Sequence, residues 1–157
     1  MAKQSVNRLS VPQFIPRYRV RLVAEGGHTA PYCVLRDSAA AAASLRPCFD
    51  GLDREQFLVC CLDAKNVSIG VNIVSIGTLS LSIVHPREVF KPAILLNAAA
   101  IIAAHNHPSG DPGPSVEDRT LTTRLREAGD LLGIKLLDHL ILGDDRHYSF
   151  ADQGWPL

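Results

Sequence analysis

Four residues in the second half of the sequence have the types and spacing of a metal site. His105 and His107 are separated by one residue, seven residues lie between His107 and Ser115, and Asp118 follows three positions later. Two histidines at positions i and i+2 at the end of a strand point their imidazoles the same way. Two imidazoles and one carboxylate leave a fourth zinc position for water, which is typical of a catalytic rather than a structural site. Zinc lowers the pKa of that water to about 7, so the pattern predicts hydrolysis with one zinc ion per chain.

Each part of this pattern has a simpler explanation when it is taken alone. A His-x-His pair by itself is a weak signal, and Ser115 with Asp118 is typical of a capping box at the start of a helix. The four residue types at these offsets together favour the metal site. Zinc deaminase chemistry is not indicated, because the sequence contains neither H-x-E nor P-C-x-x-C.

The hydrophobic pattern predicts the elements that must position these residues. Helices are predicted over residues 38–45, capped by Asp37 or Ser38, from Pro86 to about residue 98, and from the capping box to about residue 132. Strands are predicted over residues 17–22, 56–62, a segment ending near residue 77, 79–84, 99–104, 134–142 and a short run around 148–150. The two histidines then follow a buried strand, and Asp118 lies in the first turn of the next helix.

Length and composition are those of one globular domain. The chain has 157 residues, of which 46% are hydrophobic and 20% are charged. We expect a flexible basic arm over residues 1–16 and a single domain over residues 17–157. The net charge is zero, so bulk charge points to neither nucleic acid nor membrane. The first 24 residues have no acid and carry Lys3, Arg8, Arg17, Arg19 and Arg21. This arm is interpreted either as a solvated surface or as a contact for DNA phosphates.

Cysteine usage and hydropathy indicate a cytoplasmic protein. No stretch approaches the roughly 20 apolar residues that cross a bilayer, and the start of the chain lacks the pattern of a signal peptide. The four cysteines, Cys33, Cys48, Cys60 and Cys61, form no C-x-x-C pair. They are interpreted as reduced thiols of the core rather than as ligands of a structural zinc.

The motif resembles that of the JAMM (MPN-plus) metalloproteases, and the run HPREVFKPAILLNAAAIIAAHNHPSGDPGPS resembles the RadC family in particular. The resemblance extends from about residue 38 to residue 154. It implies an α/β fold of the JAB/MPN type, an α-β-α sandwich with a mixed central sheet like that of the cytidine deaminases. By position, it implies zinc ligation by His105, His107 and Asp118, and an oxyanion-stabilising role for Ser115. Longer relatives carry a DNA-binding helix-hairpin-helix module, so this chain resembles the family's short form.

The resemblance also requires a glutamate upstream of the histidines, acting as the general base on the zinc-bound water. Glu55 precedes the predicted strand 56–62, as the catalytic glutamate of the family does. Glu88 is the second candidate, although an acid at the start of a helix is also favoured by the helix dipole. We prefer Glu55.

The remaining histidines are given other roles. Asp138 and His139 are adjacent on a predicted strand and therefore point to opposite faces, which makes them poor co-ligands. A hydrogen-bonding role near the site is expected for this pair. His85 and His147 are interpreted as surface or turn residues.

Three functions remain open at this point. The leading hypothesis is a zinc-dependent peptidase or isopeptidase acting on a peptide or protein. The second is a DNA-associated accessory protein of recombination or repair without peptidase activity. The third is a catalytically inactive scaffold, against which the intact set of His, His, Ser and Asp argues.

Overall fold

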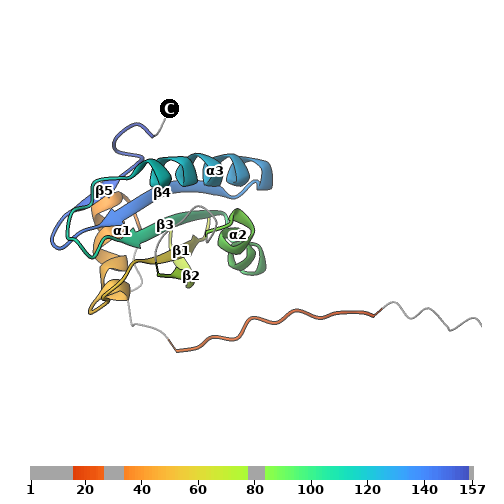
Figure 1. Ribbon diagram of the computed structural model, residues 1–157. Helices are drawn as coiled ribbons and strands as arrows, with labels where there is room; N and C mark the ends of the chain where they lie inside the picture. Colours follow the sequence, from red (N-terminus) through yellow and green to blue (C-terminus); the bar gives the residue numbers. More distant parts are fainter. Residues whose placement is uncertain (1–15, 27–33, 78–83, 156–157) are drawn as a thin grey trace, which may run out of the picture.

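The computed structural model describes residues 16–26, 34–77 and 84–155. Its centre is one five-stranded mixed sheet in the order β2-β1-β3-β4-β5 (Figure 1). The strands are β1 (Gln56–Leu62), β2 (Ser68–Ile76), β3 (Ala100–Asn106), β4 (Lys135–Leu142) and β5 (His147–Ser149). The helices are α1 (Ser38–Leu45), α2 (Pro86–Leu95) and α3 (Val116–Leu132), with a 3-10 turn at Arg46–Phe49. Only the β3–β4 pair is parallel, and the other pairs are antiparallel.

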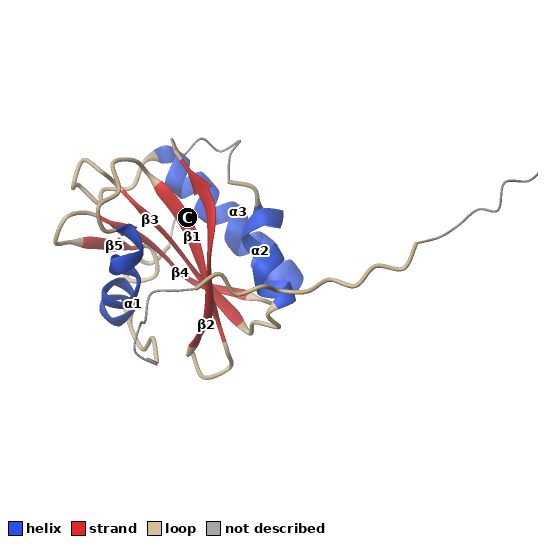
Figure 2. Cartoon of the chain, turned by 90° about the horizontal axis from the view of Figure 1, so that it is seen from below, coloured by secondary structure: helices blue, strands red, loops and turns tan. Residues whose placement is uncertain are grey.

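The helices cover both faces of the sheet. Figure 2 shows α1 on one side, and α2 and α3 on the other. Alternate residues of β1 follow this division, because Phe57 packs in the cluster with α2 and α3, whereas Leu58 packs with α1. Every residue of β1 and β3 is buried, as expected for central strands with a helix layer on each face. The predicted α-β-α sandwich with a mixed sheet is confirmed.

Local signals account for where the helices begin and end. The Asp37 side chain accepts a hydrogen bond from the amide of Ala40 at 2.7 Å and caps α1. Helix α3 begins with the predicted capping box and ends at Gly133, which has a left-handed φ of 71°. Helix α2 ends at Leu95, three residues before the predicted end at residue 98, because the chain turns at Asn97, where φ is 53°.

The strand predicted over residues 17–22 is wrong. Residues 16–26 have no regular structure, and Tyr18, Val20 and Leu22 of its apolar face are 83%, 68% and 50% exposed. The segment runs away from the sheet (Figure 1), so neither burial nor a neighbouring strand stabilises an extended pairing. The predicted strand 79–84 falls almost wholly outside the described residues, as do residues 1–15 of the predicted arm. No helix among the described residues is long and apolar enough to cross a membrane.

Candidate metal centre

The end of β3 brings the two histidines to one side of the sheet. His105 is opposite Phe57 in the β1–β3 register, is fully buried, and stacks on the Phe57 ring with centroids 6.0 Å apart. The chain leaves the strand at His107, whose amide donates to the carbonyl of Leu142 at the end of β4 over 2.9 Å. Because β3 and β4 run parallel, both imidazoles lie where these two strands have their carboxyl ends.

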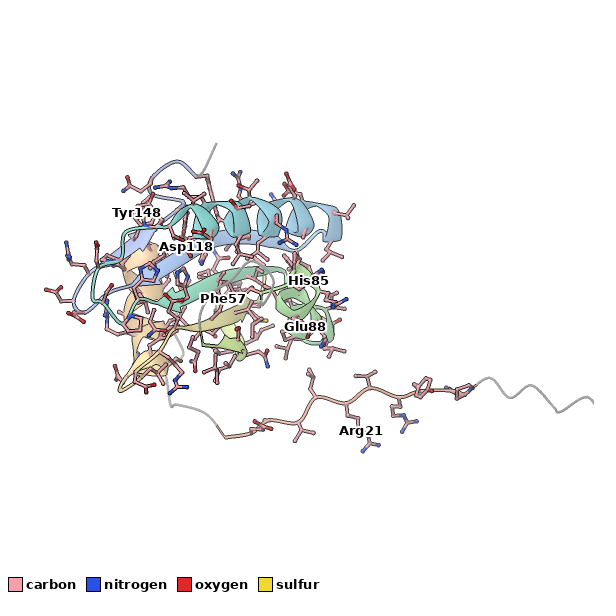
Figure 3. All side chains as sticks on the ribbon, viewed as in Figure 1. Arg21, Phe57, His85, Glu88, Asp118 and Tyr148 are labelled. Atoms are coloured by element: carbon pink, nitrogen blue, oxygen red, sulfur yellow. The ribbon has the colours of Figure 1, made fainter. Side chains whose placement is uncertain are left out.

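Helix α3 supplies the carboxylate. The capping box holds Asp118 in the first turn, where Figure 3 shows it between α3 and the sheet. Its Oδ1 lies 3.2 Å from Nε2 of His105, and its Oδ2 lies 3.6 Å from Nε2 of His107. The two Nε2 atoms are 3.1 Å apart. One ligand atom from each of the three residues thus lies within 4.8 Å of the others, and the group could hold a metal ion.

The hydrogen-bonding state of His107 supports a cation at this point. Its Nδ1 lies 2.8 Å from the backbone carbonyl of Asp111. A carbonyl oxygen only accepts, so Nδ1 carries a hydrogen, and in neutral His107 the lone pair of Nε2 is left facing Asp118. A nitrogen lone pair beside a carboxylate is stabilised by a shared proton or by a metal ion. Imidazole nitrogen and carboxylate oxygen are both ligand atoms that zinc takes.

The electrostatics of the three groups favour a proton on His107 over one on His105 when no metal is bound. Burial lowers the pKa of His105. The hydrogen bond with Asp118 raises the pKa of His107, whose side chain is only partly buried. Burial alone would raise the pKa of Asp118, but the imidazoles and the Ser115 hydroxyl outweigh it and hold that pKa below its usual range. A metal ion competes with a proton for Nε2 of His107, so acid weakens metal binding.

Comparison with known proteins identifies the family. A family profile described as a RadC-like JAB domain matches residues 35–155. The chain belongs to the RadC-like JAB domain family. Its relatives include UPF0758 proteins of Caldanaerobacter subterraneus subsp. tengcongensis, 56% identical over 104 residues, and of Moorella thermoacetica, 52% identical over 120 residues. These alignments cover 66% and 76% of this chain but 45% and 52% of the relatives, so the chain spans about half their length.

One of the two candidate glutamates, Glu55, lies near enough to His105 and His107 for its charge to act on both. Glu55 immediately precedes β1, and the β1–β3 ladder ends where Phe57 pairs with His105. Beyond it, the Asn106 side chain accepts from the Gln56 amide and donates to the Arg54 carbonyl, so it ties the backbone on both sides of Glu55 to the end of β3. The negative charge of Glu55 adds to the raised pKa of His107, and it partly offsets the effect of burial, which lowers the pKa of His105.

Glu88 lies elsewhere in the domain. It lies in the first turn of α2, where it forms ion pairs with Arg87 and Lys91, and Figure 3 shows it well away from Asp118. Its pKa is lowered, first by the hydrogen bond from Lys91. The assignment of Glu55 as the base remains a prediction, and the arrangement favours it over Glu88.

Ser115 is both a helix cap and a partner of the candidate ligand. Its hydroxyl accepts from the amide of Asp118 at 3.0 Å and donates to Oδ2 of Asp118 at 2.7 Å. The Ser115 amide donates to the same oxygen at 2.8 Å. The sequence predicted the cap, but it did not indicate that the hydroxyl is directed at the carboxylate.

Two more buried residues, His139 and Thr122, form hydrogen bonds with members of the group of His105, His107 and Asp118. Nε2 of His139 lies 2.9 Å from Nδ1 of His105, which confirms the expected hydrogen-bonding role of His139. Asp138 points to the other side, where it accepts from Ser149 at 2.6 Å. Thr122, whose Oγ1 lies 2.6 Å from Nδ1 of His139, was not predicted. Its position four residues after Asp118, on the same face of α3, was the available signal.

The two histidines that we expected at the surface lie outside the cluster. The His85 side chain accepts from the amide of Arg87 at 3.2 Å and so caps α2. His147 lies on β5, with its Nε2 3.4 Å from the Ser38 hydroxyl. Neither belongs to the group of His105, His107 and Asp118.

Proposed function

We propose that this chain is a zinc-dependent hydrolase of amide bonds, a peptidase or isopeptidase that acts on a peptide or protein. One observation carries the proposal. Two ring nitrogens and a carboxylate meet at the carboxyl end of the central strand β3, within 4.8 Å of one another. Two nitrogens with one oxygen suit zinc better than magnesium or calcium, which prefer oxygen ligands throughout. Three protein ligands also leave a coordination position open, as in catalytic zinc sites.

Each residue then has a separate task. His105, His107 and Asp118 hold the metal, which when bound supplies a Lewis acid that lowers the pKa of a water to about 7. Glu55 takes a proton from the attacking water and returns it to the departing amine, as a general base and then a general acid. Ser115 is directed at Asp118 in this structure, and during hydrolysis its hydroxyl donates to the oxygen on which negative charge develops.

The first test is metal content. Protein purified without chelator should hold about one zinc per chain by elemental mass spectrometry. The double variant His105→Ala/His107→Ala should lose it, because two of three ligands are removed. The matched control His85→Ala/His147→Ala removes two histidines outside the cluster and should keep it. Full zinc occupancy in the first double variant would contradict the site.

The second part of the test is hydrolysis. The zinc-loaded protein is incubated with a library of proteome-derived peptides and proteins, and newly freed amines are labelled and counted by mass spectrometry. Glu55→Gln should keep zinc but free amines about 10²–10⁴ times more slowly, the usual worth of a general base. Glu88→Gln is the control acid and should act like the wild type. Absence of new amines with fully loaded wild-type protein would overturn the hydrolase proposal.

A second candidate function is DNA-associated accessory work in recombination or repair. The observation that favours it is the exposed segment of residues 16–26, which carries Arg17, Arg19 and Arg21. Exposed arginines in an extended segment can contact phosphates without specific base recognition.

Either function suits the cytoplasm. Cys48, Cys60 and Cys61 are free thiols here, and thiols stay reduced in that compartment.

A further inference from the structure

Behind His105, a chain of hydrogen bonds runs through the core from β3 to α3. Nδ1 of His105 lies 2.9 Å from Nε2 of His139, and Nδ1 of His139 lies 2.6 Å from the Thr122 hydroxyl. That hydroxyl donates to the backbone carbonyl of Asp118 at 2.6 Å. His105, His139 and Thr122 are fully buried. The chain therefore begins at one candidate ligand, His105, and ends on the backbone of another, Asp118, with no access to water.

The carbonyl at its end sets the direction of every bond. The carbonyl of Asp118 only accepts, so its bond with Thr122 uses the single hydroxyl hydrogen of Thr122. With its hydrogen in the bond to the carbonyl, the Thr122 oxygen is an acceptor, and Nδ1 of His139 donates to it. A neutral imidazole carries one N–H, so Nε2 of His139 accepts in turn from Nδ1–H of His105. Nε2 of His105 is left without a hydrogen, and its lone pair faces Asp118 and His107.

A charged His139 would break this sequence of donors, and its surroundings oppose the charge. Its ring lies between Phe57, at 5.4 Å between centroids, and Phe150, at 5.2 Å. The carboxylate of Asp138 bonds the backbone amide of His139 and the Ser149 hydroxyl rather than the ring, and burial of the ring disfavours the imidazolium. The neutral form, with one donor and one acceptor nitrogen, matches the two partners that the structure provides.

We propose that Thr122 and His139 are positioning residues that lock His105 in the tautomer whose Nε2 can bind a metal. The inference rests on the proposed metal site but concerns residues that do not touch the metal. Partners that hold the second nitrogen of a ligating histidine orient the ring and raise its basicity. Here the partner is itself a histidine, and its own tautomer is set by Thr122.

The lock opposes a competing arrangement. If His105 carried its hydrogen on Nε2, that N–H would face Oδ1 of Asp118 at 3.2 Å and could donate to it. His105 would then accept at Nδ1 from His139, and the metal-binding lone pair would be gone. This reversed chain leaves the Thr122 oxygen opposite an unprotonated nitrogen, with its hydrogen still bound to Asp118. Two lone pairs 2.6 Å apart repel each other, and relief would require the hydroxyl to turn away from the Asp118 carbonyl. The bond to that carbonyl therefore selects the forward direction.

The test uses two substitutions at Thr122 and two measurements. Thr122→Val removes the hydroxyl and keeps the shape, whereas Thr122→Ser keeps the hydroxyl and is the matched control. The tautomer of His105 is read from its ring ¹⁵N shifts in metal-free protein at alkaline pH. Zinc affinity is measured by competition with a chromophoric chelator.

In the wild type and in Thr122→Ser, His105 should carry its hydrogen on Nδ1. In Thr122→Val the hydrogen should move to Nε2, and zinc affinity should fall about 10–100-fold, the usual cost of losing such a partner. A structural role alone would lower stability without moving the hydrogen. The wild-type spectrum tests the direction of the chain even where a variant folds poorly.

Two results would overturn the inference: an Nε2–H tautomer of His105 in the wild type, or equal zinc affinities for Thr122→Val and Thr122→Ser. Failure of the metal site looks different. A wild-type protein that binds no zinc contradicts the proposed function, and the ¹⁵N spectrum of His105 then still decides the direction of the chain.

Discussion

At the scale of single residues, the two jobs of Ser115 can be separated. Its hydroxyl oxygen accepts from the α3 backbone, which caps the helix, and its hydrogen points at Oδ2 of Asp118. The first bond stabilises the fold, and the second holds the carboxylate toward the histidines. During hydrolysis the same hydrogen would be the one that reaches the developing oxyanion, so a donor at this position has value beyond capping.

Substitution of Ser115 should therefore affect stability and rate differently. Ser115→Ala removes both bonds and should cost about 1 kcal/mol of unfolding free energy, as caps do. It should also slow hydrolysis about 10²–10³-fold, the usual effect of losing one oxyanion donor. Ser115→Asp keeps a capping oxygen but offers no donor and adds a negative charge beside Asp118, so it should lose activity while keeping most of its stability. Thermal denaturation and rate measurements on the same samples decide, and near-normal hydrolysis by Ser115→Ala would leave the serine as a cap only.

At the scale of elements, the loop after β3 is held by the loop after β4. The amide of Gly110 donates to the carbonyl of His107 at 3.0 Å, and the carbonyl of Gly110 packs directly on Gly143. A Cβ at position 143 would lie 3.0 Å from the carbonyl carbon of Gly110, and closer still to its oxygen. Glycine at this position allows the two loops to approach, and so determines where the backbone of His107 lies.

Gly143→Ala should consequently weaken metal binding. The added methyl group must push the loop of Gly110 outward and move His107 relative to His105, and we expect zinc affinity to fall about tenfold, within the range for altered ligand support. Gly133→Ala is the matched control. Its φ of 71° strains an alanine, but it lies at the far end of α3 with open space around it, so it should cost about 1 kcal/mol of stability and leave zinc affinity unchanged. Equal zinc affinities for the two variants would show that the loop contact does not position His107.

At the scale of the whole molecule, the exposed segment of residues 16–26 is separate from the sandwich. Residues 16–26 are exposed throughout and run away from the sheet (Figure 1), whereas Asp118 of the candidate metal centre lies in the first turn of α3 (Figure 3). Since the chain has no net charge, the arginines of this segment are a local concentration of positive charge rather than part of a basic surface.

The triple variant Arg17→Ala/Arg19→Ala/Arg21→Ala should therefore keep the zinc affinity, hydrolysis and melting temperature of the wild type, because exposed side chains contribute little to stability. Binding to a labelled DNA duplex is measured on the same proteins at increasing salt. A salt-dependent shift that the triple variant loses would favour the DNA-associated function. A drop in zinc affinity or melting temperature would show that the segment contacts the domain in solution.

The sequence by itself determined the parts of this protein that depend on short-range chemistry. The capping box at Ser115, the buried strand 56–62 and the glycine end of α3 were all predicted, because a cap or an apolar run acts within a few residues of chain. The ligand set of His105, His107 and Asp118 was predicted in the same way, from types at close offsets. Their meeting within 4.8 Å agrees with that spacing.

Only the tertiary structure decided what depends on neighbours distant in the sequence. The alternation in residues 17–22 suits a half-buried strand, but no strand pairs with it among the described residues, and without a neighbour the pattern forms no sheet. The sequence favoured Glu55 over Glu88 by its position before a strand, but the contacts that hold it are tertiary, because the Asn106 side chain ties the backbone on both sides of Glu55 to the end of β3. Thr122 and His139, 17 residues apart, form one hydrogen-bond chain because α3 packs on β4. Such contacts arise from packing between layers, which no local pattern encodes.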